Sequence, residues 1–262
     1  MAQHDYWDAE DYHTKWLDNA ERQGVPAEVV GDIARRHHIS PASFTVLERF
    51  TEITDPHGKS FFLVPRGAQG DDVRAAALMT YVLNGGTGYG VAGKQPGDFP
   101  ATPYCAAEVQ RIINRQNMNG WSYRRDIGFV HRNRGRLVTT PNGILMGSGG
   151  NWIQRRFSHR GGTTWGDIFM VNTGKVTDPA ERLRRIVGSG HVWYTDRRDR
   201  HFQSSLDLDR VLHHEERHCR QWAAMGYAGM LRCYSWELLR ELVFRKTNRL
   251  EEDAGLSDGG YR

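Results

Sequence analysis

Apolar residues recur at helical spacing in several segments of the chain. Residues three and four positions apart lie on one face of an α-helix, so this spacing predicts amphipathic helices. The predicted helices cover residues 5–22, 26–38, 71–83, 104–117, 206–226 and 230–252. Within 206–226, Val211, Trp222 and Met225 share their face with His214 and His218. We therefore expect both imidazoles to point toward the interior.

Short apolar runs bounded by turn residues predict strands between these helices. The runs are 44–47 and 61–64, which flank a turn at 55–58, followed by 127–130, 137–140, 143–146 and 161–171. Strands followed by a pair of helices are typical of an α+β domain. We predict a small N-terminal helical extension over residues 1–40 and an α+β domain over residues 41–262. That domain would hold a short, partly antiparallel sheet followed by a two-helix C-terminal unit.

Composition narrows the class of protein only slightly. The 262 residues are 39% hydrophobic, which suffices for a substantial core. The 35 basic and 31 acidic residues nearly cancel, so nucleic-acid binding is permitted but not favoured. The three cysteines are an odd number and lack the spacing of a disulfide framework, so we expect them to be reduced thiols. Since we find no signal peptide and no transmembrane run, we expect a cytoplasmic location, with non-classical secretion as an alternative.

Residues 214–218 read His-Glu-Glu-Arg-His, the pattern H-E-x-x-H. Residues four apart lie one helical turn apart, so both imidazoles can bind one ion. Glu215 lies about 100° around the helix, where it can approach a metal-bound water as a general base without displacing a ligand. The alternative is a solvated helix with incidental histidines, because a chain with 12 His can form the motif by chance.

A zinc site needs a third protein ligand, because two histidines leave the tetrahedron half empty. Glu251 lies 33 residues beyond His218. A turn at 226–229 and an antiparallel return would bring its carboxylate back beside the histidines. Competing ligands are also present, first Glu252 and then Glu237, Glu241 and Asp258.

Residues 206–254 resemble the minimal gluzincin pattern of many bacterial zincin-like proteins. The H-E-x-x-H motif is followed by Gln221 and by a hydrophobic helix that ends in N-x-x-E-x-x-A, Asn248 to Ala254. The resemblance implies Zn²⁺ bound by His214, His218 and Glu251, with Glu215 as the catalytic base of a metallopeptidase that cleaves peptide or protein substrates. Many zincins have a small residue before the second histidine, and this chain departs from them with Arg217.

The same resemblance implies a strand beside the metal helix, here within 161–171, with residues 163–166 lining a cleft. An extended peptide could pair with the edge of that strand. The reaction also needs a group that stabilises the oxyanion, and Tyr261 or one of the arginines could serve. Metal-bound histidines normally donate their other ring nitrogen to an oxygen, for which Asp167 and Asp253 are both suitable.

Other functions stay open at this point. Residues 88–94 match a phosphate-loop pattern, but the following Gln95-Pro96 cannot open the helix that such a loop needs. Arginines are dense between residues 124 and 200, and Trp121, Tyr123, Trp152 and Trp165 are interleaved with them. A non-catalytic module that binds nucleic acid or a protein partner is therefore one alternative. A secreted effector that retains the zincin fold without turnover is another, and the sequence leaves the oligomeric state unknown.

Overall fold

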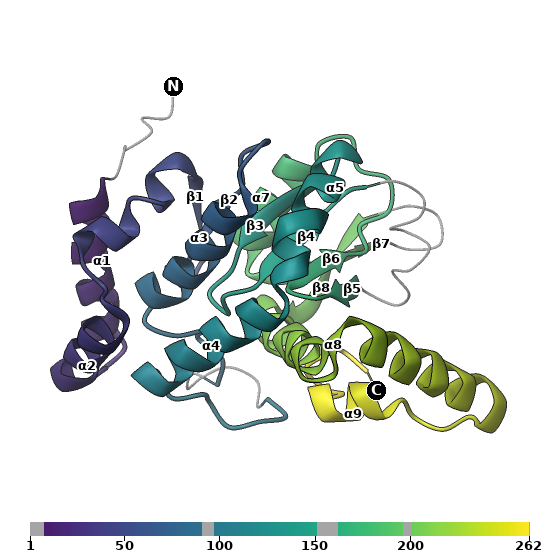
Figure 1. Ribbon diagram of the computed structural model, residues 1–262. Coiled ribbons are helices and arrows are strands. Elements are labelled where there is room, and N and C mark those ends of the chain that lie inside the picture. Colours follow the sequence, from purple (N-terminus) through teal and green to yellow (C-terminus); the bar gives the residue numbers. More distant parts are fainter. Residues whose placement is uncertain (1–7, 91–96, 151–161, 196–200, 262) are drawn as a thin grey trace.

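The structure is a computed structural model that describes residues 8–90, 97–150, 162–195 and 201–261. It confirms the α+β fold, with a six-stranded mixed sheet, helices on both of its faces and a long helix near the C-terminus (Figure 1). The helices are α1 (Ala9–Arg22), α2 (Ala27–His37), α3 (Gly70–Leu83), α4 (Ala106–Met118), α5 (Ile127–Arg132), α7 (Pro179–Ser189), α8 (Leu208–Phe244) and α9 (Arg249–Ala254). The strands are β1 (Thr51–Thr54), β2 (Ser60–Leu63), β3 (Arg136–Thr139), β4 (Leu145–Ser148), β5 (Gly162–Trp165), β6 (Ile168–Val171), β7 (His191–Thr195) and β8 (His201–Asp207).

The large sheet has the strand order β1-β2-β3-β4-β6-β5. Neighbouring strands are antiparallel except for β4 and β6, which are parallel, so the sheet is partly antiparallel as predicted. The predicted strand 161–171 is a hairpin in which Gly166 turns the chain at a positive φ of 61°. This turn leaves β5 at one end of the sheet. The hairpin of β7 and β8 forms a separate two-stranded sheet that the sequence pattern did not predict.

Both faces of the central strands of the sheet are buried. Successive side chains of a strand point to opposite faces, and in β6 Ile168 and Met170 join the cluster of buried residues that includes α3, α4 and α5. Phe169 and Val171 join a second cluster with α7 and the first half of α8. Burial on both faces explains why the strands read as continuous apolar runs rather than as alternating patterns.

The predicted N-terminal helices are confirmed in the described part of the chain as α1 and α2. Tyr12, Trp16 and Ile33 are buried in the same cluster as Phe62 of β2. The Trp16 indole donates to the hydroxyl of Tyr104 at 2.9 Å. These helices therefore pack, through buried side chains, into the core cluster that covers one face of the sheet. A domain boundary at residue 40 stays a prediction.

Two of the predicted strands are wrong. Residues 127–130 begin helix α5, in which Ile127 and Val130 are buried and Phe129 is exposed, a helical spacing. Residues 44–47 run from the last residue of one short 3₁₀ helix, Pro41–Phe44, through a turn to the first residue of another, Leu47–Arg49. The first of these helices begins at a proline, which suits a helix start. An apolar run of four residues is too short to distinguish a strand from a buried helical turn.

The C-terminal helices also differ from the prediction. Helix α8 continues from Leu208 to Phe244, and Gly226 alone has non-helical angles, φ 66° and ψ 170°, which break its course (Figure 1). The chain reverses only after Phe244, where Arg245 adopts the left-handed conformation. The predicted end of the first helix at Gly226 is therefore confirmed, whereas the predicted reversal at 226–229 is wrong, because a second helix continues from there to Phe244. The short helix α9, capped by the side chain of Asn248, lies on the returning chain.

A buried ion network joins α8 to α4 and to β6. Arg115 of α4 forms an ion pair with Glu216 of α8, and its Nε lies 3.3 Å from Asp167, next to β6. The side chains of all three are at most 3% exposed. Asn119 completes the connection by donating both to Asp167 Oδ1 at 2.6 Å and to the carbonyl of Cys219 at 2.9 Å. The network therefore fixes which face of α8 points toward the sheet.

Replacing Glu216 by glutamine should lower the free energy of unfolding by about 3–5 kcal/mol, because Arg115 then remains buried without its anion. Burial opposes ionisation of Glu216, but Arg115, Arg220 and Arg111 outweigh it and lower its pKa from the usual 4.5 to about 2. The stability from this carboxylate is therefore present above pH 4.5 and is lost as the pH falls toward 2. Urea denaturation of metal-free protein at several pH values measures both effects.

The exposed Glu181 of α7, which pairs with Arg185 on the same helix, supplies the matched control. Glu181→Gln should change the free energy of unfolding by no more than about 0.5 kcal/mol. If Glu216→Gln were as stable as the wild type, or lost stability in acid just as the wild type does, the network would not hold α8 in place.

Candidate metal centre

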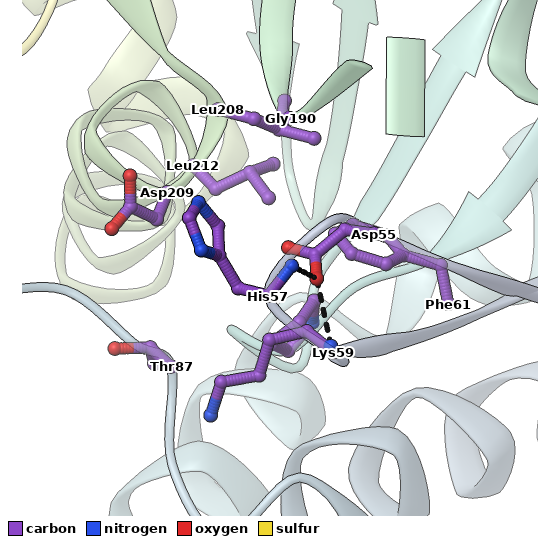
Figure 2. Close-up of a pocket in the computed structure, with 10 residues that line it drawn as sticks. Asp55, His57, Lys59, Phe61, Thr87, Gly190, Leu208, Asp209 and Leu212 are labelled. Carbon is purple, nitrogen blue, oxygen red and sulfur yellow. Dashed lines mark hydrogen bonds between the residues drawn. The ribbon is translucent and has the colours of Figure 1, made fainter. Parts of the chain in front are cut away.

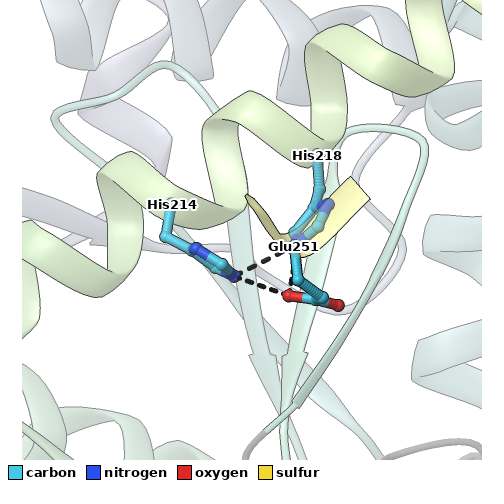
Figure 3. Close-up of side chains that lie close together, drawn as sticks. All are labelled: His214, His218 and Glu251. Atoms are coloured by element: carbon cyan, nitrogen blue, oxygen red, sulfur yellow. Dashed lines mark hydrogen bonds and ion pairs between the residues drawn. The ribbon is translucent and has the colours of Figure 1, made fainter. Parts of the chain in front are cut away.

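Two histidines and one glutamate converge between α8 and α9 (Figure 3). The Nε2 atoms of His214 and His218 lie 3.1 Å apart, and each lies 3.3 Å from Oε2 of Glu251. Around tetrahedral zinc with bonds of about 2.0–2.1 Å, neighbouring ligand atoms are separated by ~3.3 Å. The three atoms therefore have the spacing of three corners of a zinc tetrahedron. They form a possible metal-binding site.

The chain brings Glu251 to the histidines through contacts between α8 and α9. Leu250, its neighbour, packs in a small buried cluster with Trp222 and Met230 of α8. The amide of Gln221 donates to the Leu250 carbonyl at 2.9 Å. Asn248 also caps α9 by accepting from the Leu250 amide at 2.9 Å. Hydrogen bonds to both the amide and the carbonyl of Leu250 therefore fix the first turn of this short helix.

The second nitrogen of each imidazole has an oxygen partner. Nδ1 of His214 lies 2.9 Å from the Gly255 carbonyl, which can only accept, so Nδ1 carries a proton and Nε2 is the nitrogen that remains to bind an ion. Nδ1 of His218 lies 2.8 Å from Oε1 of Gln221. Such partners orient the ligands of metal sites. The same Gln221 donates to Asp253 at 2.9 Å, so Asp253 is linked to His218 through this amide and not by a direct contact.

The predicted role of Asp167 beside a histidine is wrong. Its carboxylate accepts from Asn119 and from the Tyr123 hydroxyl, at 2.6 and 2.9 Å, and pairs with Arg115. A buried carboxylate with an arginine partner has little capacity left for a ring nitrogen. Asp167 therefore stabilises α8 through Arg115 and Asn119, on the side of the helix away from the histidines.

The electrostatics of the group favour a cation between the three side chains. Burial opposes ionisation of Glu251, but hydrogen bonds from His214 and His218 outweigh it and hold its pKa well below the usual range. Burial likewise opposes the charged form of His218, yet Glu251 and Glu215 raise its pKa to about 9. In the metal-free protein a proton therefore supplies the positive charge that an ion would otherwise bring.

Glu215 is buried beside this group and faces strand β5. The Thr164 hydroxyl donates a hydrogen bond to its Oε2. Burial raises the pKa of Glu215, and the two histidines only partly offset that effect. The indole of Trp222 donates to the Thr164 carbonyl at 3.0 Å, which ties the strand to α8. Within the segment 163–166, which was predicted to line a cleft, Thr164 thus contacts Glu215.

The competing ligands lie elsewhere. Glu252 is exposed. Glu237 pairs with Arg249 and Arg240, and Asp258 pairs with Arg210 at 2.8 Å. Among the described residues, the metal-binding group includes neither these three nor Glu241.

The side chain of Arg217, the departure from the zincin pattern, is directed away from the metal-binding group. Its Nε donates to the Asp253 carbonyl at 2.7 Å, and its guanidinium lies 3.7 Å from the ring centroid of Phe99. The bulk of this arginine therefore does not crowd the ligands. It connects α8 to the returning chain instead.

Further neighbours of the site are Tyr261, which was suggested for the oxyanion, and Gly259 and Tyr194, which the sequence pattern did not predict. A side chain at Gly259 would place its Cβ 2.6 Å from His214 Cε1, so only glycine allows this close approach. The Tyr261 ring lies 6.1 Å from the His214 ring, and burial together with Glu251 raises the pKa of its hydroxyl. Burial and Glu215 raise the pKa of Tyr194 in β7 to about 12. The pair of glycines before Tyr261 is the one local sequence feature that could have indicated this close approach.

A small cavity lies where the turn between β1 and β2 meets the start of α8 (Figure 2). Its volume is about 10 Å³, which is room for about one water molecule. The Asp55 carboxylate accepts from the backbone amides of His57 and Lys59, at 2.9 and 2.7 Å, and so stabilises the turn. This cavity has no room for a substrate.

The other sequence patterns have no clear counterpart among the described residues. Residues 91–96 of the phosphate-loop pattern and Trp152 lie outside them. Tyr123 is buried, so it cannot stack on a base, while Trp121 and Trp165 pack against Trp222. Binding of nucleic acid or of another partner therefore stays a prediction. In the described part of the chain, no helix combines the length and the apolar character needed to cross a membrane.

Comparisons of the chain with protein-family models, with curated proteins and with solved structures found no match in any of the three. The likeness to zincins therefore depends on the motif residues and on the geometry of the metal-binding group alone.

Gln221→Ala should weaken zinc binding by about 10–100-fold, because His218 loses the acceptor that orients its ring. Competition with a chromophoric chelator measures the affinity. Gln110→Ala, which removes an exposed glutamine of α4, is the control and should bind zinc as the wild type does. Equal affinities in the wild type and Gln221→Ala would show that this amide does not position the ligand.

Proposed function

We propose that the protein is a zinc-dependent hydrolase, and specifically a metallopeptidase. The observation that carries the proposal is the position of the buried Glu215 carboxylate, next to the group of His214, His218 and Glu251 and in contact with Thr164. A metal site that is only structural needs no buried acid beside its ligands. A hydrolase needs a proton acceptor in that place.

The donor set of two imidazoles and one carboxylate suits zinc and leaves one coordination position for water. When bound, the ion would lower the pKa of that water and polarise the carbonyl of the substrate. Glu215 takes the proton from the attacking water and passes it to the leaving amine. Burial favours this exchange, because a carboxyl group with a raised pKa accepts a proton more readily near neutral pH.

Two further features support a peptide substrate. Among the described strands, β5 ends the sheet order, which supports the pairing of an extended peptide along its outer edge. Tyr261 is the better of the two suggestions for the oxyanion, because its raised pKa keeps the hydroxyl protonated as a donor. Arg217, the arginine within the motif, already contacts Asp253 and Phe99.

Glu215→Gln tests the proposed function, because it removes the proton acceptor and keeps the shape of the side chain. Hydrolysis of fluorescein-labelled casein should fall by about 10²–10⁴-fold while the zinc content stays that of the wild type. Glu252→Gln, a change in an exposed carboxylate next to a ligand, should leave hydrolysis unchanged. Hydrolysis that persists in Glu215→Gln would argue against Glu215 as the base, and a wild type that binds zinc but cleaves nothing would favour the non-catalytic alternatives.

A further inference from the structure

Exposed apolar side chains gather on the second half of α8. The described residues contain eleven large hydrophobic side chains that are exposed, and seven of them belong to this half-helix. They are Tyr227, Leu231, Tyr234, Trp236, Leu238, Leu239 and Val243. Isolated exposed apolar residues are ordinary, whereas a continuous group of this kind marks a surface that binds something.

The exposed residues form two adjoining stripes on one helix. Tyr227, Leu231, Tyr234 and Leu238 follow one another at spacings of four and three, and so do Arg232, Trp236, Leu239 and Val243. The opposite side of the helix is buried against the returning chain through Met230 and Glu237. Figure 1 shows this half of α8 and the returning chain extending away from the sheet. The apolar surface therefore lies on a part of the chain that protrudes from the rest of the molecule.

The same segment carries excess positive charge. Residues 227–249 contain five basic side chains and two acidic ones, a net charge of +3. Glu237 is buried and paired with Arg240 and Arg249, whereas Arg232, Arg245 and Lys246 are exposed. The acidic residues 251–253 lie on α9, where Glu251 contacts the histidines and Asp253 contacts Arg217. The outer end of the segment is therefore cationic.

We propose that residues 227–249, here called the outer segment, dock on a lipid bilayer that carries anionic headgroups. Tryptophan, tyrosine and leucine beside arginine and lysine are the composition of helices that lie in the membrane interface. The apolar stripes enter the boundary between headgroups and acyl chains, and Arg232, Arg245 and Lys246 contact phosphates. A second copy of the chain fits this surface less well, because two segments of charge +3 repel each other. Docking also places the metal-binding group, at the base of the segment, near the bilayer.

Flotation with lipid vesicles tests the proposal on the full chain. The wild type should bind vesicles of phosphatidylcholine mixed with phosphatidylglycerol and should bind pure phosphatidylcholine much more weakly. Added salt should reduce the binding, because it screens the headgroup charge. Trp236→Ser combined with Leu239→Ser should weaken binding by at least ~50-fold. Arg245→Glu combined with Lys246→Glu should weaken it by at least ~30-fold.

Matched controls separate this surface from the general properties of the chain. Met118→Ser removes an exposed apolar side chain of α4, and Arg35→Glu with Arg36→Glu reverses two exposed charges of α2. Both should bind vesicles as the wild type does. Glu215→Gln should also bind normally, because docking does not depend on hydrolysis, so failure of the proposed function leaves this test intact.

Absence of binding to the anionic vesicles would overturn the proposal, as would wild-type binding by both variants of the outer segment. Light scattering tests the alternative that a second copy of the chain covers this surface. A wild-type dimer that Trp236→Ser and Leu239→Ser convert to a monomer, without vesicle binding, would make the surface a contact between copies and contradict the lipid assignment.

Discussion

The buried ion network of Arg115, Glu216 and Asp167 is the constraint on which the rest of the site depends. Successive residues of a helix are rotated by about 100°, so fixing Glu216 against Arg115 also fixes the directions of His214, Glu215 and His218. Burying these charges contributes little net stability by itself, because desolvation offsets much of the attraction. What the network supplies is one rotation of α8, in which the imidazoles face α9 and Glu215 faces β5.

The third side chain of the group comes from a different part of the chain, which must return across α8 to reach it. Gln221 holds this return at the Leu250 carbonyl, the Gly255 carbonyl meets His214, and Arg210 holds Asp258 further on. Each of these contacts is short and buried or partly buried, so the ligands are already close to their final spacing in the metal-free protein. A site prepared in this way loses little conformational entropy when an ion binds.

Local chemistry explains which features could be predicted from the sequence. The pairing of His214 with His218 depends only on helical spacing. Glu251 could be predicted because its motif lies at a distance that a helix and a return can span. The reversal after Phe244 could not be placed, because Gly226 is an equally good breaking signal and the choice depends on tertiary packing. Neither Thr164 beside Glu215 nor Gly259 beside His214 has a local signature, since each contact joins segments far apart in the chain.

The metal content of protein purified without a histidine tag tests the central claim most directly. Elemental analysis should find close to one zinc per chain in the wild type and in Glu252→Ala, and almost none in Glu251→Ala, because Glu251 alone of the two carboxylates faces the histidines. The same measurement would detect iron, which also binds two histidines and a carboxylate. Zinc retained in Glu251→Ala, or no metal in any of the three proteins after reconstitution, would contradict the account.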